Sequence, residues 1–327
     1  MTNSSAPENT HHSKPLGVIT GLGMAVPKQS VTNEHFASYL DTSDEWIRER
    51  TGIENRYWAE GESINDLILE ASKKALAESG ITAEQLDGII VATSTAEHAF
   101  PSAACELQAS LGAKKAFAYD LAAACSGFVY GLMTAKGHLS SGLAKNILLV
   151  GAEVFSKVID KQDRGTCILF GDGAGAAVIS SSAEEGRGMI AGELRSDGKL
   201  GEILYLKSRG EDAYINMQGR DVFKSAVRSL ADISLEVLEK SGTNVDEIDW
   251  YVSHQANKRI LSSVANHMKL PEEKVLLNVS QYGNTSAASI PILLAESAAA
   301  GKIKPGDLVM ISAYGGGATW GAVLLRW

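Results

Sequence analysis

The feature that most constrains the fold of this 327-residue chain is an internal repeat. The segments LDGIIVATST (86–95) and IDWYVSHQAN (248–257) each follow an amphipathic helical pattern that ends in Ser-Gly and a short polar linker. Each half later closes with a Gly/Ala-rich piece, FGDGAGAAVIS or YGGGATWGAVLLRW. Any α/β protein alternates strands and helices, but four features matched in one order favour duplication. We expect two copies of a βαβαβ-type unit of roughly 160 residues.

Apolar runs alternate with helical patterns along the whole chain, which is typical of α/β layering. Helices are expected at 64–80 and 222–242, closed by Gly80 and Gly242. Domain boundaries follow from the repeat: a disordered polar tail over 1–14, an N-terminal half over 15–183 and a C-terminal half over 184–327. Buried strands are expected at 86–95, 145–153, 173–180, 248–254 and 307–315.

The repeat also predicts a site where the halves meet. Cys125 lies 38 residues after Asp87, and Asn284 lies 35 residues after Asp249, so we align Cys125 with Asn284. Both lie where a loop enters a helix at the centre of a half. A pseudo-twofold arrangement would bring the two helix starts together and place both side chains at the seam.

Cys125 has the surroundings of a nucleophile. Its neighbours in AAACSG are small, so a substrate can approach closely. A helix N-terminus stabilises a thiolate through its dipole and free N–H groups. We interpret Cys105 and Cys167, in helical and strand-like apolar contexts, as buried structural residues. Three scattered cysteines without C-x-x-C form neither a disulfide framework nor a zinc site, so free thiols and a cytoplasmic location are expected.

His254 ends a buried strand, where α/β folds place active sites, and Asn284 starts a helix. Cysteine, histidine and asparagine in this chain order fit two mechanisms. One is papain-like hydrolysis, in which histidine activates cysteine. The other is thioester condensation, in which cysteine carries an acyl group while histidine and asparagine hold a thioester oxygen. The duplication favours condensation, because it sets Asn284 opposite Cys125 rather than behind His254.

Composition limits the partners. The formal net charge of −9 argues against nucleic-acid binding, and an acidic partner would need a local basic patch. No apolar run approaches the roughly 20 residues that span a bilayer. We therefore expect neither nucleic acid nor membrane as a partner.

Seven sequence blocks, in this order, make the chain resemble the β-ketoacyl-[acyl-carrier-protein] synthase III family of the thiolase superfamily. The resemblance runs from about Gly17 to Trp327 and implies a thiolase-like α/β fold with five layers, αβαβα. The blocks are TSDEWIRERTGIENR (42–56), HAFPSAACELQ (98–108), AACSGF (123–128), DRGTCILFGDGAGAAV (163–178), SHQANKRI (253–260), YGNTSAASIP (282–291) and YGGGATWGAVLLRW (314–327).

The resemblance implies that Cys125 takes an acyl group from acyl-CoA. The N–H groups of Cys125 and Gly316 would form the oxyanion hole. His254, through a neutral Nε2–H, and Asn284 would then hold the oxygen of malonyl-carrier protein as it loses CO₂. The resulting carbanion would attack the acyl-cysteine and give a 3-ketoacyl-carrier protein. Acyl-CoA is a substrate here, and no cofactor or metal is implied.

The resemblance also implies binding sites. Trp46 and Arg164 would hold the CoA adenine between them, and Arg50 would reach the CoA phosphates. Phe100 would cross the interface of a homodimer to close the partner's acyl pocket. Phe170 and Ala318 would line the acyl pocket of their own chain. Ala318 replaces an aromatic residue of the family, which would enlarge the space near Cys125 and admit primers other than acetyl.

A basic patch would dock the acidic carrier protein. The resemblance places Lys224 and Arg259 in it. Asn266 and His267 stand where family members often carry a basic pair, and Arg220 replaces a smaller amide residue near the tunnel mouth. The departure at Asn266 and His267 leaves the carrier footprint open, and the sequence assigns no role to Arg220.

We therefore expect condensation of a short acyl-CoA, acetyl-CoA first, with malonyl-carrier protein to start fatty-acid synthesis. One alternative is a ketoacyl synthase or acyltransferase of secondary metabolism with another primer or acceptor. A Cys-His-Asn hydrolase is the alternative from another class. A non-catalytic binding protein would leave the Cys, His and Asn set without a task.

Overall fold

The computed structural model describes residues 17–181, 186–208, 210 and 213–327. Its N-terminal half contains a five-stranded sheet in the order β1-β7-β6-β4-β5. β4, β5 and β6 run parallel, whereas β7 is antiparallel to both β6 and β1. The strands are β1 (Val18–Ala25), β4 (Gly88–Ala92), β5 (Phe117–Leu121), β6 (Asn146–Glu153) and β7 (Gly173–Ser180).

The C-terminal half contains a four-stranded sheet in the order β11-β12-β13-β8. β11 and β12 are parallel, and β12, β13 and β8 form an antiparallel run. All five strands predicted from the sequence are confirmed; β7 matches at both ends, and no end of the other four differs by more than three residues. The strands are β8 (Gly188–Ser196), β11 (Trp250–Ser253), β12 (Leu308–Gly315) and β13 (Thr319–Arg326).

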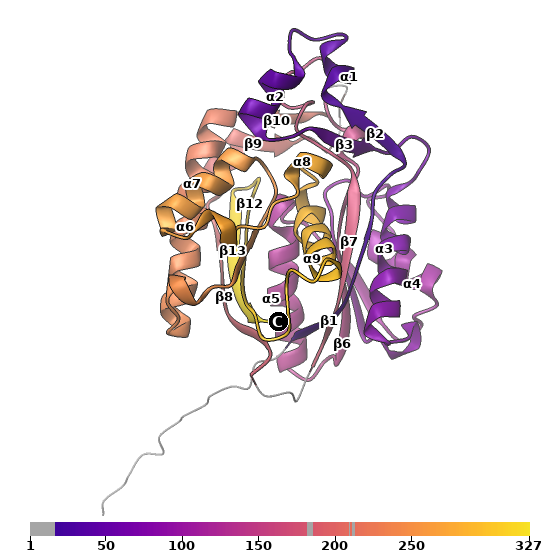
Figure 1. Cartoon of the computed structure of the whole chain (residues 1–327). Coiled ribbons are helices and arrows are strands. Elements are labelled where there is room, and N and C mark those ends of the chain that lie inside the picture. The colour runs from indigo at the N-terminus through magenta and orange to yellow at the C-terminus, as the bar shows by residue number, and fades with distance from the viewer. Residues whose placement is uncertain (1–16, 182–185, 209, 211–212) are drawn as a thin grey trace, which may run out of the picture.

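Helices cover both faces of both sheets and give the five-layer αβαβα order that was predicted (Figure 1). Two helices lie in the middle layer, where their apolar side chains share one core with both sheets. Each outer layer has its own apolar cluster against one sheet. The middle helices are α5 (Gly127–Ser140) and α9 (Ser289–Ala299); the outer ones are α3 (Ile64–Ser79) and α4 (Ala103–Leu111) on one side, and α6 (Gly219–Ser241) and α7 (Lys258–Met268) on the other.

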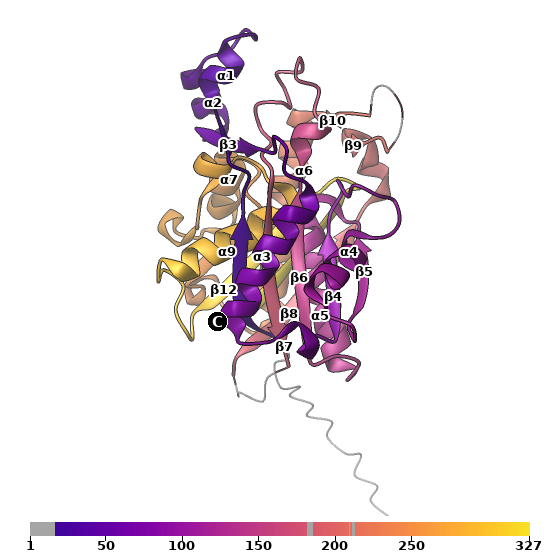
Figure 2. The ribbon, with the colours of Figure 1, turned by 90° about the vertical axis from the view of Figure 1, so that its right-hand side faces the viewer.

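Shorter elements cover one end of the layers, at the top of Figure 1, and a second view shows them above the sheets (Figure 2). Their core is a small cluster around Phe36, Trp58 and Phe170. They form the roof over the carboxyl ends of β4, β6 and β11. They are β2 (Gln29–Thr32), α1 (Asn33–Ala37), α2 (Asp44–Thr51), β3 (Asn55–Trp58), β9 (Leu204–Leu206), β10 (Ile215–Met217) and α8 (Val279–Tyr282).

The two halves follow one register over much of their length. Gly80 and Gly242 both end a helix in the left-handed conformation, with φ of 69° and 67°. The backbone N–H of Asp87 donates to the carbonyl of the residue at the start of β6, and that of Asp249 donates to the carbonyl at the start of β12. These pairs are related by one shift of 162 residues (80 to 242, 87 to 249).

The same shift corrects the predicted alignment of Cys125. It pairs Cys125 with Ala287 rather than with Asn284 (125 to 287). Backbone geometry agrees with this pairing. Ala124 precedes Cys125 and Ser286 precedes Ala287, and both have a left-handed φ, of 45° and 49°. Asn284 lies three residues before Ala287, so the two halves supply their site side chains from different positions of the repeat. The predicted tail 1–14 and the predicted boundary at 183/184 lie outside the described residues.

Close packing at the seam makes Gly151 a test of this architecture. A Cβ on Gly151, in β6, would lie 2.1 Å from the carbonyl oxygen of Ala287. We expect Gly151→Ala to lower the free energy of unfolding by about 1–3 kcal/mol, because backbone atoms must move apart. Urea unfolding measures this change.

The control is Gly137→Ala on α5, where nothing lies within 4 Å of the added Cβ. Alanine favours a helix interior, so this variant should gain about 0.5–1 kcal/mol. Equal stabilities of the two variants would contradict the tight seam.

Candidate active site

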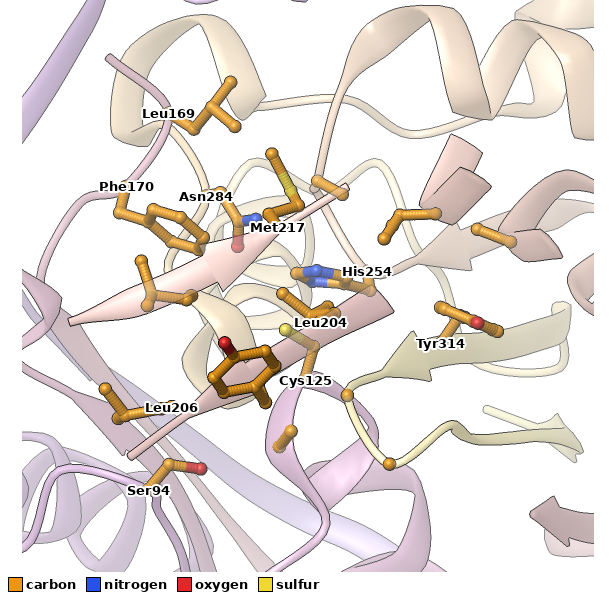
Figure 3. A pocket seen from close by; sticks show the side chains of 18 of the residues that line it. Ser94, Cys125, Leu169, Phe170, Leu204, Leu206, Met217, His254, Asn284 and Tyr314 are labelled. Atoms are coloured by element: carbon orange, nitrogen blue, oxygen red, sulfur yellow. The ribbon is translucent and has the colours of Figure 1, made fainter. Parts of the chain in front are cut away.

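A cavity of about 610 Å³ lies under the roof, and Cys125, His254 and Asn284 all line it (Figure 3). The three predicted catalytic side chains come from three separate segments of the chain. Most of the remaining lining is apolar, including Leu169 and Phe170. A dry, apolar site strengthens every electrostatic interaction made inside it.

Cys125 lies in the middle of a short 3₁₀ turn, η2 (Ala124–Ser126), that leads into α5. Its side chain is buried at the floor of the cavity. Gly315, at the end of β12, approaches so closely that a Cβ there would lie 2.8 Å from the Cys125 backbone nitrogen. Gly316 follows directly and lines the same cavity. The proposed oxyanion-hole residues are therefore neighbours across the seam.

The protonation state of Cys125 differs from the sequence expectation. Burial raises the pKa of the thiol to about 12, and the nearby Glu153 carboxylate adds to this, whereas the Ser286 hydroxyl opposes it. The prediction that the helix start favours a thiolate is wrong for this state, because desolvation outweighs it. Cys125 is a thiol at neutral pH and must lose its proton when it attacks.

The other two cysteines are not candidates for the site. Cys167 is buried, as predicted, but it lies on a turn rather than a strand. Cys105 lies on α4, as predicted, but its side chain is exposed rather than buried. Neither lines the cavity.

His254 follows directly on β11, and its ring is buried in the cavity wall. Burial lowers the pKa of the imidazole to about 4, so the ring is neutral at pH 7. Its Nδ1 lies 2.7 Å from the Ser289 hydroxyl oxygen. That hydroxyl also lies 2.8 Å from the Ser286 carbonyl and has one proton to donate. While it donates to that carbonyl, the ring must donate through Nδ1–H and Nε2 carries no proton; when it turns to donate to Nδ1, the ring carries its proton on Nε2, as the predicted donor role requires.

Asn284 is fixed by three contacts. Its backbone N–H donates to the Leu169 carbonyl at 2.8 Å, and its carbonyl accepts from the Gly171 N–H at 3.0 Å. Its side-chain Oδ1 accepts from the Ser286 N–H at 2.9 Å. Because Oδ1 is occupied, the Nδ2 amide is the group that Asn284 can present to a ligand in the cavity.

Sequence reasoning missed two residues beside Cys125. The Ser286 hydroxyl lies 3.2 Å from the Cys125 Sγ. Glu153, the last residue of β6, is fully buried, and its Oε1 lies 3.5 Å from the same hydroxyl. An acidic residue closing the apolar run NILLVGAE was a visible signal, as was the serine in YGNTSAAS.

A second hollow, of about 640 Å³, opens beside the cavity and shares Leu169, Gly219 and Phe223 with it. This hollow, which we call the mouth, collects positive charge on a chain that is acidic overall. Such a local field attracts anionic ligands. Its lining includes Trp46, Arg50, Arg164, Arg220, Lys224 and Arg259.

Two cations lie over the Trp46 ring in this structure. The guanidinium carbons of Arg50 and Arg164 lie 4.6 and 4.8 Å from its ring centroid. These are cation–π distances, so Arg164 occupies a face of the indole itself. The Arg164 guanidinium also donates a hydrogen bond to the backbone carbonyl of Asp41. An adenine held between Trp46 and Arg164, as predicted, would require Arg164 to move away from the ring.

The three predicted acyl-pocket residues have different surroundings. Phe170 lines the cavity. Phe100 is 87% exposed on a loop before α4 and does not contact the cavity of its own chain. Ala318 is 1% exposed and does not line the cavity either, which corrects its predicted place. It belongs instead to the apolar cluster that also contains the lining residues Val222 and Ala226.

The predicted carrier patch is partly assembled. Lys224, on α6, and Arg259, on α7, line the mouth together. Asn266 and His267 lie in the last turn of α7, away from it, where His267 approaches Asp232. Arg220 lies at the mouth itself, in the first turn of α6.

Comparisons with known proteins agree with this geometry. Family models described as 3-oxoacyl-[acyl-carrier-protein (ACP)] synthase III and its C-terminal part match residues 119–198 and 238–327. The chain is 49% identical over 319 residues to a β-ketoacyl-[acyl-carrier-protein] synthase III of Paracoccus denitrificans, covering 95% of this chain and 99% of that protein. A crystal structure of the synthase III from Aquifex aeolicus matches with a TM-score of 0.92 and 47% identity, over 95% of this chain and all of that one.

More distant structures share the fold. The priming β-ketosynthase of the R1128 polyketide pathway matches with a TM-score of 0.91 at 30% identity, covering 98% of each chain. Within the described residues, every helix is too short or too polar to cross a bilayer.

We expect His254 to stay neutral until the pH falls to about 4. Its pKa is lowered on folding, so folding stability from this group is lost as the pH falls from about 6.5 through 4. NMR titration of ¹⁵N-histidine, with His254→Asn to assign the signal, measures both pKa and tautomer. A midpoint near 6.5 would contradict the buried ring.

Proposed function

We propose a reaction for this chain from one premise: it belongs to the 3-oxoacyl-[acyl-carrier-protein] synthase III family. It is an acyltransferase of the condensing class. It joins the acyl group of a short acyl-CoA to malonyl-carrier protein and thereby starts fatty-acid synthesis. The observation that supports this most is one apolar cavity that holds Cys125, His254 and Asn284 and opens into a basic mouth.

The first half-reaction loads the enzyme. The Cys125 sulfur attacks the thioester carbon, its S–H proton leaves, and CoA departs as a thiolate that takes a proton from solvent. The N–H groups of Cys125 and Gly316 would hold the oxyanion of the tetrahedral intermediate. In the mouth, Arg50 would bind the CoA phosphates, and the adenine would enter between Trp46 and Arg164 once Arg164 has moved away from the ring.

The second half-reaction makes the carbon–carbon bond. Malonyl-carrier protein loses CO₂, and the electron pair left behind forms an enolate. The His254 Nε2–H and the Asn284 Nδ2–H would donate to the enolate oxygen. The enolate carbon attacks the acyl-cysteine, the carbon–sulfur bond breaks, and Cys125 regains a proton. Loss of one such donor costs roughly 3 kcal/mol of barrier.

Two features bear on the primer. The cavity is lined mostly by apolar residues, and at about 610 Å³ it is large for an acetyl group. We infer that primers longer or more branched than acetyl also load.

A homodimer is part of the same proposal. β5 is an edge strand of its sheet, and all five of its residues are partly exposed. The exposed Phe100 lies on the loop between β4 and α4, and the start of α4 is held against β5, because the N–H groups of Ala103 and Ala104 donate to the Asp120 carboxylate. A second copy paired along β5 would cover this edge and receive Phe100 into its cavity. Sedimentation should give twice the 34.7 kDa chain mass, and a monomer would overturn this part.

The three free thiols support a cytoplasmic location.

The polyketide-type alternative is not favoured. Curated synthase III relatives are 47–49% identical to this chain over about 95% of its length, whereas the priming β-ketosynthase is 30% identical. The hydrolase alternative has no support in the relatives.

Intact mass spectrometry after brief exposure to acetyl-, butyryl- and isobutyryl-CoA tests the reaction. Wild type should gain one acyl group from each at similar rates, and Cys125→Ser should gain none. His254→Ala and Asn284→Ala should load but condense roughly 10²–10³-fold more slowly, because each removes one donor. No adduct from any primer would overturn the proposed reaction, and strict acetyl preference would overturn the wider primer range.

Carrier docking is tested by charge reversal. Lys224→Glu should raise the KM for malonyl-carrier protein about tenfold, because it puts an acid where an acidic partner binds. Arg228→Glu is the matched control, one turn further along α6, outside the mouth and paired with Asp232. If Arg228→Glu raised the KM for malonyl-carrier protein as much as Lys224→Glu does, a docking site at the mouth would be contradicted. Acyl loading, measured separately, reports any effect on CoA.

A further inference from the structure

A buried carboxylate that the proposed reaction does not use lies two contacts from the nucleophile. Glu153 ends β6, and its side chain is fully buried. The Ser286 hydroxyl oxygen lies 3.2 Å from the Cys125 Sγ and 3.5 Å from the Glu153 Oε1. The three side chains therefore connect the reacting sulfur to a group that can hold a proton.

Neutral donors surround Glu153. The Thr95 hydroxyl donates to Oε2 at 2.6 Å, the Ser94 N–H lies 3.1 Å from both oxygens, and the Thr93 hydroxyl lies 3.4 Å from Oε2. These groups follow β4, and Ser286 reaches the carboxylate from the turn before α9. Among the described residues, no ion pair to a cation involves Glu153.

An unpaired buried charge is costly, so burial raises the pKa of Glu153 to about 8. The hydrogen bonds to its carboxylate lower the pKa, but they do not offset the effect of burial. The other titratable group of the site, His254, has its pKa lowered to about 4. Glu153 is therefore mostly protonated at pH 7, and its ionised fraction, which grows as the pH rises through about 8, accepts a proton far more readily than the imidazole does. The chain thus has an internal base in contact with the Ser286 hydroxyl.

We propose that Ser286 relays the proton of Cys125 to Glu153, which stores it while the cysteine is acylated. This inference rests on the proposed function. As the sulfur bonds to the acyl carbon, the Cys125 proton passes to the Ser286 oxygen and the Ser286 proton passes to the Glu153 carboxylate. When the enolate later displaces the sulfur, the proton returns by the same path. The cycle leaves Cys125 as a thiol and Glu153 as a carboxylate, while the departing CoA thiolate takes its proton from solvent.

The test is single-turnover release of CoA from acetyl-CoA without malonyl-carrier protein, measured from pH 6 to 10. The wild-type rate should rise with pH through about 8, since the acceptor must be ionised. Glu153→Gln should slow release roughly 100-fold and lose this rise, because it removes the base. Glu153→Asp should recover part of the rate and the rise.

Ser286→Ala keeps the carboxylate but breaks the relay, so its rate and pH profile should resemble those of Glu153→Gln. If Glu153→Gln does not fold, Ser286→Ala tests the relay in its place. Ser126→Ala is the matched control. Its hydroxyl is also buried beside Cys125, but it bonds the Ala123 carbonyl and Thr319 instead. It should keep the wild-type profile.

Wild-type rates and pH profiles in both Glu153→Gln and Ser286→Ala would overturn the relay while leaving the proposed function intact. Failure of the wild type to release CoA from any acyl-CoA would overturn the proposed function and the relay with it.

Discussion

The contact between the starts of α5 and α9 is the constraint on which the rest of the structure depends. The two helices begin face to face between the sheets, and the Cys125 Sγ lies 3.2 Å from the Ser286 hydroxyl across this seam. Strands must come unusually close to form it. Gly315 approaches the backbone of η2, and Gly151 approaches the carbonyl of Ala287. A side chain at either glycine would separate the segments that carry the reaction.

Burial at this seam decides the chemistry of its side chains. The same desolvation keeps the Cys125 thiol and the Glu153 carboxyl protonated to higher pH and keeps the His254 ring neutral. A neutral imidazole is a donor suited to an enolate oxygen, and a basic carboxylate is suited to receive a proton. Charge is instead concentrated at the mouth, where solvent reaches the arginines. The enzyme thus separates recognition of anionic substrates from reaction in an apolar interior.

Much of the fold was predictable because it follows from local patterns. Apolar runs located the five buried strands, and Gly80 and Gly242 located two helix ends. The candidate residues Cys125, His254 and Asn284 were also identified, since each stands where an element begins or ends. The alignment of Cys125 with Asn284 was wrong by three residues. Residue type alone suggested that pairing, whereas the backbone conformations of Ala124 and Ser286 define the register.

The sequence by itself determined the duplicated α/β architecture and pointed to Cys125 as the candidate nucleophile, because periodicity and motif spacing are written along the chain. Only the tertiary structure decided the electrostatics of the site. The pKa of Cys125 depends on burial and on Glu153, which lies 28 positions away, and the relay requires Ser286 from the other half. It likewise decided that Ala318 does not line the cavity and that Arg164 covers Trp46. Solvation and proximity arise from packing between distant segments, and no local pattern encodes them.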